Sequence, residues 1–273
     1  MKKKVLILSV ITLVIVCLVS FAGCSFLGTF YTDRTPYYID SAQIDDAKAG
    51  NIVANNNLFS AVRVITSYRN GKASAGTGFI VTEDGYVVTN RHCVVMFSST
   101  GSDKPYNPLE EPLDATYQLV FVDDTVVDAY LVAYSKDADL AVLKIRKYLE
   151  ITGETKFDPV TLAKSDELYY GDKLFTIGNP EDMGLVLTDV MVSSPGIKLS
   201  SEDSFKSIIL DGTINHGNSG GALFDCYGNV VGVVYARVEG SNEDAYGIGC
   251  GIPLSELKSF LDEVKVSYTV ASE

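Results

Sequence analysis

Apolar and polar residues alternate along most of this chain with a period of two, which is typical of β-strands that bury one face. The first such run is Ala61–Thr66, and a hairpin follows in which Gly78–Thr82 and Tyr86–Asn90 flank a turn at Glu83–Gly85. The remaining predicted strands fall into two groups, Tyr117–Val122, Val126–Ala133 and Leu140–Ile145, then Leu174–Ile177, Leu185–Ser193, Lys206–Leu210, Gly221–Phe224 and Val230–Ala236. Short strands separated by regular turns predict barrels or sandwiches, and the two groups predict two barrel-like halves.

Two segments carry a helical period instead. Ser41–Asn56 begins with a residue that can cap a helix and places a few apolar residues on one side. In Pro253–Val264 the apolar residues recur every three or four positions. The pattern therefore predicts an all-β protein with a short helix before the strands and a short C-terminal helix after them.

The chain before the first strand is typical of an export signal followed by a tether. Lys2–Lys4 precede a long apolar run, which ends at Phe21-Ala22-Gly23-Cys24. That ending is similar to a bacterial lipobox, in which the cysteine is lipidated and becomes the mature N-terminus. We therefore predict lipidation at Cys24 and a lipoprotein on the outer face of a bacterial cell membrane. An uncleaved signal anchor and a cleaved, secreted form remain alternatives, because the run is just long enough to cross a bilayer.

These patterns divide the chain into four parts. We predict a signal peptide at 1–23, a tether with a short helix at 24–56, a folded domain at 57–265 and a tail at 266–273. Within the folded domain, the first barrel is placed at about 57–150, the second at about 159–252 and the helix at 253–264.

Composition and charge then narrow the function classes. The formal net charge is −13, and the only run of three basic residues is Lys2–Lys4, so no nucleic-acid partner is predicted. Removing residues 1–23 would take away three lysines and no acidic residue, so membrane attachment would depend on acyl chains rather than on a basic patch. With two histidines and no C-x-x-C pair, neither a metal nor another cofactor is predicted.

Three cysteines lie beyond the signal and the lipidation site, at Cys93, Cys226 and Cys250. An odd number excludes a complete disulfide framework within the chain. We therefore treat them as small apolar residues.

The sharpest local feature is the string Gly217-Asn218-Ser219-Gly220-Gly221. A serine between glycines can lie on a tight turn where the backbone approaches a ligand closely. The string also fits the G-x-S-x-G nucleophile elbow of α/β-hydrolases, in which the histidine follows the serine. No histidine follows His216 in this sequence, so a general base must lie upstream, and the order His, Asp, Ser is that of the chymotrypsin arrangement.

His92 and His216 compete for the role of general base. His216 is only three residues before Ser219, and so short a turn can hardly return the imidazole to the serine hydroxyl. We therefore predict that His92, which follows a predicted strand, is the base. His216 is then expected at the polar lip of a substrate pocket.

Asp139 stands directly before the apolar strand Leu140–Ile145. A carboxylate there can be held partly buried against an imidazole, whose tautomer it orients. Asp137, two residues earlier on the same face of an extended chain, is the competing candidate, but it fits an exposed turn better. We predict Asp139 as the third member of a triad with His92 and Ser219.

Six motifs together resemble one known family. They are Gly76-Thr77-Gly78-Phe79-Ile80, Val88-Thr89-Asn90-Arg91-His92, Asp139-Leu140-Ala141-Val142-Leu143, Ile177-Gly178-Asn179-Pro180, the string from Asp211 to Gly221, and Gly249-Cys250-Gly251-Ile252-Pro253. In this order and spacing, over about residues 57–265, they resemble the protease domain of the HtrA-like (high-temperature-requirement) trypsin-like serine proteases.

The resemblance implies two antiparallel β-barrels of the chymotrypsin type with an active site between them. It implies a serine endopeptidase that acts on exported or misfolded proteins through an acyl-enzyme, with His92, Asp139 and Ser219 as the triad. It also implies that the backbone N–H groups of Gly217 and Ser219 form the oxyanion hole.

The chain departs from the family pattern in three places. Family members usually continue into PDZ domains, and this sequence is expected to be a protease domain without one. The segment Thr188-Asp189-Val190 replaces the Thr-x-Gly of the family, and His216 occupies a position that is more often Arg or Pro.

Substrate choice is predicted from the pocket positions of the trypsin-like arrangement. Thr213, six residues before the nucleophile, is expected at the base of the pocket, and Val233 and Val234 along one wall. Without a carboxylate at Thr213, we expect small or medium apolar side chains rather than Lys or Arg. An inactive fold that binds peptides at the membrane surface and an esterase with the same triad remain alternatives.

Overall fold

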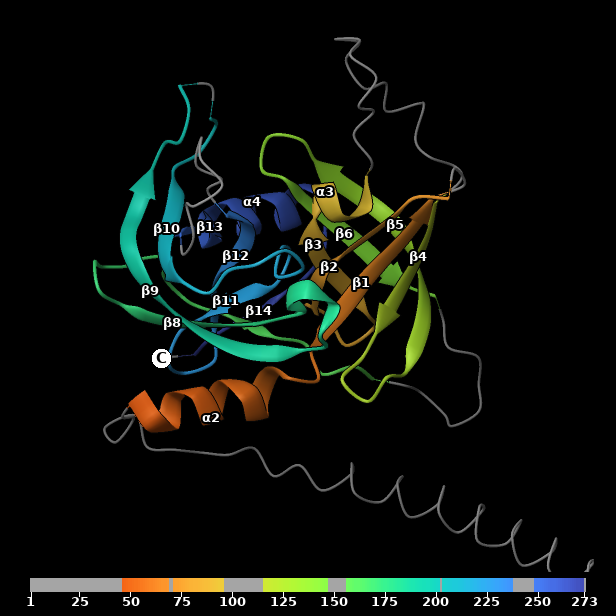
Figure 1. Ribbon diagram of the computed structural model, residues 1–273, viewed down its shortest axis with the longest axis horizontal. Coiled ribbons are helices and arrows are strands. Elements are labelled where there is room, and N and C mark those ends of the chain that lie inside the picture. Colours follow the sequence, from red (N-terminus) through yellow and green to blue (C-terminus); the bar gives the residue numbers. More distant parts are fainter. Residues whose placement is uncertain are drawn as a thin grey trace, which may run out of the picture. The chain divides into compact units, whose positions relative to one another are not determined.

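Two six-stranded antiparallel barrels account for most of the chain that can be described (Figure 1). We describe a computed structural model over residues 46–68, 71–95, 115–146, 156–201, 203–237 and 248–272. The predicted signal peptide, the tether up to residue 45 and the lipidation site Cys24 lie outside these residues. The prediction of an all-β fold with two antiparallel barrels is confirmed.

The first barrel closes in the order β1-β2-β3-β6-β5-β4. Its strands are β1 (Ala61–Tyr68), β2 (Ala73–Ile80), β3 (Tyr86–Asn90), β4 (Ala115–Val120), β5 (Val126–Ser135) and β6 (Leu140–Ile145). Alternate apolar residues of these strands, such as Val62 and Val64 on β1, point inward and are fully buried. Period-two alternation in the sequence therefore becomes the filled interior of a closed barrel.

The second barrel runs β8-β9-β10-β13-β12-β11 and closes by pairing β11 with β12. Its strands are β8 (Lys173–Gly178), β9 (Val186–Ile197), β10 (Ser207–Gly212), β11 (Ala222–Phe224), β12 (Val230–Arg237) and β13 (Ile248–Pro253). The sequence patterns missed β13, because its alternating glycines hide the period of two. A Cβ atom at Gly249 would lie 2.5 Å from the Ile214 side chain, so packing requires glycine there.

Two helices, α4 and α2, pack against the second barrel. Helix α4 (Leu254–Glu263) follows β13 at the predicted place and buries Leu257 and Leu261 completely. Helix α2 (Asp46–Asn57) contacts β8 and β9. Among the described residues, no helix is long and apolar enough to cross a membrane.

Two short strands extend the second sheet beyond the barrel. Strand β7 (Thr161–Leu162) pairs in parallel with both β12 and β14 (Thr269–Val270). The segment 266–273, predicted to be a tail, therefore contains a paired strand, and Val266 within it is buried. Two residues of strand carry too short a pattern to be predicted from the sequence.

Candidate active site

His92 lies on a one-turn helix directly after β3. This helix, α3 (Arg91–Val94), begins where β3 pairs with the start of β6, through Asn90 and Leu140. The Arg91 N–H donates a hydrogen bond to the Asp139 carbonyl oxygen at 3.0 Å. The end of one strand and the start of another thus bring His92 beside Asp139, 47 positions away in the sequence.

The Asp139 carboxylate contacts His92 through both of its oxygens. Oδ2 lies 2.6 Å from His92 Nδ1, and Oδ1 accepts the backbone N–H of His92 at 3.1 Å. The Asp139 side chain is 23% exposed and the His92 side chain 33% exposed, so water screens the contact only in part. Asp139 itself has a positive φ of 51° at the turn into β6. The competing candidate Asp137 is exposed, as predicted.

This contact changes the proton affinity of the imidazole. Burial lowers the pKa of His92, but the contacts with Asp139 and Cys93 together outweigh burial and raise it to about 10. A negative carboxylate beside an imidazole stabilises the charged imidazolium. The arrangement can therefore hold a proton on His92 once one has been taken up.

Ser219 lies in the turn between β10 and β11 and is attached to the first barrel. Its carbonyl oxygen accepts the Thr77 N–H at 2.8 Å and lies 3.6 Å from the Cys93 thiol, so the turn lies beside the residue that follows His92. Gly220 has a φ of +86°, and a Cβ there would lie 2.1 Å from the Thr77 carbonyl oxygen. The glycine after Ser219 therefore permits the close approach of the two barrels.

The Ser219 hydroxyl itself donates to the carbonyl oxygen of Tyr235 at 3.4 Å. Within the described part of the chain, no hydrogen bond joins this hydroxyl to His92. Tyr235 lies at a β-bulge of β12, where the register to β13 shifts between Val234 and Ala236. Such bulges redirect a residue out of the regular ladder.

The phenol of Tyr235 is held by Ser207 and Phe205. Its oxygen lies 2.8 Å from the Ser207 hydroxyl, and its ring meets Phe205 edge to face. Burial raises the pKa of Tyr235 to about 12, so the phenol stays neutral. Nothing in the sequence pattern singles out Tyr235, because its contact with Ser219 depends on the bulge.

The turn before Ser219 is held by the loop after β8. The His216 carbonyl oxygen accepts the Glu181 N–H at 2.9 Å. Because C=O and N–H point in opposite directions across a trans peptide, the Gly217 N–H is directed away from Glu181. Among the described residues, neither the Gly217 N–H nor the Ser219 N–H donates a hydrogen bond. Both donors are therefore available to a ligand.

Two of the four predicted pocket residues are exposed and the other two are buried. Thr213 and His216 are exposed beside the turn. Val233 and Val234 on β12 are 0% exposed and belong to a buried apolar cluster that includes residues of both barrels. Because both side chains are fully buried, neither of them lines a pocket that is open to solvent in this structure.

The described residues contain no cluster of three or more His, Cys, Asp or Glu side chains that could hold an ion. The thiols of Cys93 and Cys250 are buried and form no disulfide with another described residue. Acid–base chemistry at His92 and nucleophilic chemistry at Ser219 are what the arrangement can support.

The chain is similar in sequence and in fold to known proteins. The sequence model of the trypsin-like peptidase domain matches residues 76–233. The chain is 34% identical to a protein of Brucella suis named "Probable periplasmic serine endoprotease DegP-like". The 189 aligned residues cover 69% of this chain and 32% of that protein. The chain is also 35% identical to the protein of the same name from Chlamydia trachomatis. The 193 aligned residues cover 70% of this chain and 34% of that protein.

A solved structure of the HtrA-type protease AlgW with a tripeptide is also similar, with a TM-score of 0.63 and 26% identity over 82% of this chain and 64% of that one. The chain spans about a third of the length of the curated relatives it matches. The predicted resemblance to HtrA-like proteases is thereby confirmed. The chain belongs to the family of trypsin-like peptidase domains.

Proposed function

We propose that the chain is a serine endopeptidase that cleaves peptide bonds of exported or misfolded proteins. The observation that carries the proposal is the Asp139 carboxylate, which occupies both Nδ1 and the backbone N–H of His92. With Nδ1 bound in this way, Nε2 is the nitrogen left to take a proton. The glycine-flanked turn of Ser219 lies next to Cys93 and supplies the nucleophile.

In the proposed reaction, His92 Nε2 removes the proton of the Ser219 hydroxyl as the oxygen attacks the substrate carbonyl. The hydroxyl first rotates away from the Tyr235 carbonyl oxygen, whose 3.4 Å contact is weak enough to exchange. The peptide C–N bond breaks as the imidazolium returns its proton to the leaving amine. Water then hydrolyses the acyl-enzyme with the same base.

The developing oxyanion would be stabilised by the N–H groups of Gly217 and Ser219. Their support is the direction of the His216–Gly217 peptide, whose carbonyl is bound to Glu181 on the opposite side. Donors that are already oriented stabilise charge without the cost of reorganisation when the reaction occurs.

We also propose that the protein is exported, as the names of its DegP-like relatives describe for those proteins. Lipidation at Cys24 would hold it on the outer face of the membrane, with an uncleaved signal anchor as the alternative. Protein or peptide substrates and the membrane are its proposed partners.

One observation favours a second function, a fold that binds peptides without cleaving them. The Ser219 hydroxyl lies on the Tyr235 carbonyl rather than on His92. If this rotamer persisted with substrate bound, the nucleophile would not be activated.

Covalent labelling separates the two functions. We expect a fluorophosphonate probe to label the full chain in detergent at Ser219, read by mass spectrometry of the modified peptide, because an activated serine attacks phosphorus as it attacks a carbonyl. The same preparation is expected to digest casein. Absence of both labelling and digestion in a folded sample would establish the peptide-binding alternative.

Substrate preference follows from Thr213 at the proposed base of the pocket. A threonine hydroxyl gives no negative charge to pair with a basic side chain, so we expect cleavage after small or medium apolar residues. A peptide library with cut sites mapped by mass spectrometry measures the preference. Dominant cleavage after Lys or Arg would contradict the assignment of Thr213.

A further inference from the structure

The loop that follows β8 has an unusual backbone. Within Asn179–Gly184, Glu181 has φ 49° and ψ 29°, and Asp182 has φ 58°. Two consecutive residues other than glycine in the left-handed region are strained, and such strain persists only when surrounding contacts hold it. The contacts of this loop therefore identify what keeps it in shape.

Asn179 holds the loop from the inside. Its side chain is fully buried, and both ends of the amide are used. Nδ2 donates to Asp182 Oδ1 at 3.1 Å, and Oδ1 accepts the Gly184 N–H at 2.9 Å. One amide thus spans the strained residues from both sides.

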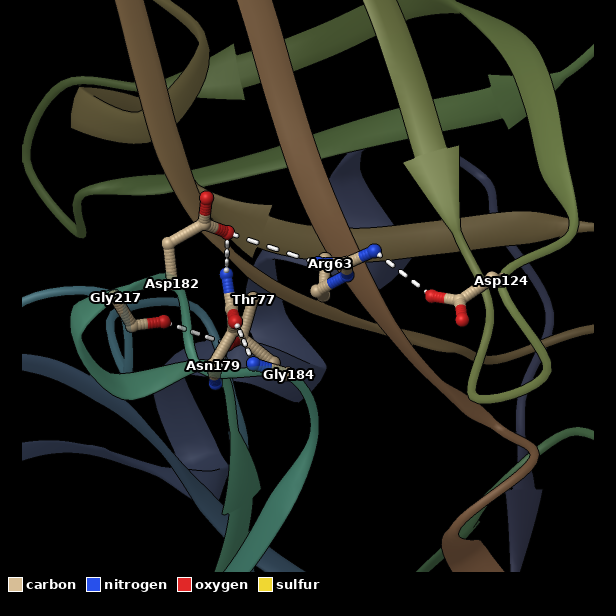
Figure 2. Close-up of polar contacts among 7 residues, drawn as sticks. All are labelled: Arg63, Thr77, Asp124, Asn179, Asp182, Gly184 and Gly217. Atoms are coloured by element: carbon tan, nitrogen blue, oxygen red, sulfur yellow. Dashed lines mark hydrogen bonds and ion pairs between the residues drawn. The ribbon is translucent and has the colours of Figure 1, made fainter.

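Arg63 of the first barrel approaches the loop from outside (Figure 2). Its guanidinium lies between two carboxylates, with Nη1 3.7 Å from Asp182 Oδ1 and Nη2 3.2 Å from Asp124 Oδ1. The Arg63 side chain is 20% exposed, whereas Asp182 is 69% and Asp124 88% exposed. Asp124 belongs to the turn between β4 and β5 of the same barrel. Of the two carboxylates that pair with Arg63 in the described part of the chain, Asp182 is therefore the one on the side of the second barrel.

One direct hydrogen bond and one bridge through the Thr77 hydroxyl connect the loop to the turn before Ser219. The Glu181 N–H holds the His216 carbonyl oxygen, as described above. The Thr77 hydroxyl accepts the Asn179 N–H at 3.0 Å and donates to the Gly217 carbonyl oxygen at 2.7 Å. Thr77 is the direct partner of Arg63 in the β1–β2 register, so both side chains leave the same face of the first barrel.

We propose that Asp182, held by Asn179 and Arg63, is a positioning residue for the oxyanion donor of Gly217. Asp182 keeps the strained loop in the conformation in which the Glu181 N–H can hold the His216 carbonyl. That bond directs the Gly217 N–H toward the substrate. The inference rests on the proposed peptidase function and assigns a role in it to a carboxylate that does not contact the substrate.

Asp182→Ala is the test, with Asp124→Ala as the matched control. Both variants remove a carboxylate bound to Arg63, but only the first removes the connection to the loop. Because complete loss of one oxyanion donor costs about 10²–10³ in kcat, we expect a displaced donor to cost about ten-fold, with KM nearly unchanged. Asp124→Ala is expected to keep the kcat of the unchanged chain.

A peptide boronate gives a readout that general loosening would not move. It forms a tetrahedral adduct with the serine and therefore depends on the oxyanion donors. In Asp182→Ala its affinity is expected to fall by about the same factor as kcat, while a product peptide that forms no adduct keeps its affinity. Asp182→Asn, which retains an oxygen for the Asn179 amide but loses the charge, is expected to lie between the unchanged chain and Asp182→Ala.

The outcomes distinguish the inference from the function on which it rests. If the unchanged chain neither cleaves peptides nor binds the boronate, the peptidase function fails. If it does both and Asp182→Ala matches Asp124→Ala in kcat and in boronate affinity, the positioning role is overturned. A fall in kcat with equal losses of boronate and product-peptide affinity would also overturn it, because the damage would then not be specific to the oxyanion donors.

Discussion

Replacing Ser219 with alanine is expected to lower kcat on casein or a peptide substrate by about 10⁶-fold, because no other group in the turn can form the acyl-enzyme. His92→Ala is expected to lower kcat by about the same factor, since the serine hydroxyl is a weak nucleophile without a base. The double variant should be no slower than either single variant, because the two residues act as one unit. Initial rates over several hours, with active-site titration, measure the three values.

Ser165→Ala is the control for this series. Ser165 is an exposed serine whose hydroxyl oxygen only accepts the Glu167 N–H in a local turn, at 3.1 Å, and its loss is expected to leave kcat unchanged. Cleavage by Ser219→Ala at the rate of the unchanged chain would remove the serine from the mechanism.

Asp139→Asn is expected to lower kcat by about 10⁴-fold while the protein remains folded. The amide can keep the contact with His92 Nδ1 but favours the wrong tautomer and no longer stabilises the imidazolium. Asp137→Asn, two residues earlier and exposed, is the matched control, and we expect it to retain full activity. A large fall of kcat in Asp137→Asn, with little change of kcat in Asp139→Asn, would assign the triad carboxylate to Asp137 instead.

The same variant is expected to move the pH dependence, and the direction follows from the pKa of His92. Only the neutral imidazole can accept the serine proton, so kcat/KM rises with pH through this pKa. The contacts with Asp139 and Cys93 raise the pKa to about 10 against the opposing effect of burial. The acid limb of the unchanged chain should therefore lie above the ordinary value of about 6.5. In Asp139→Asn it should shift to lower pH, and a limb that does not move would contradict the electrostatic role.

Local pattern was sufficient to predict most of the strands. The observed β3 and β6 have the predicted bounds, because each combines a clear apolar pattern with a distinct turn at its end. Strand β13 was not predicted, since its glycines are explained only by the Ile214 and Leu223 side chains that pack against them. Strand β14 was missed because two residues gain stability only from a partner that is distant in sequence.

The amino-acid sequence alone was enough to predict which residue types carry the chemistry and in what order they occur. The single serine between glycines, the absence of a histidine after it and the aspartate before an apolar strand are all local facts about Ser219, His216 and Asp139. They predicted the chymotrypsin order of a triad. Six motifs together predicted the HtrA-like family and the two-barrel fold, both of which are confirmed.

How these residues are held became known from the three-dimensional structure. It placed Val233 and Val234 in the core, turned the Ser219 hydroxyl toward the Tyr235 carbonyl and joined Asp182 to Arg63. Each of these depends on contacts between strands and loops that are distant in the sequence. A period of two predicts which face of a strand is apolar, but it contains no information about which other element meets that face.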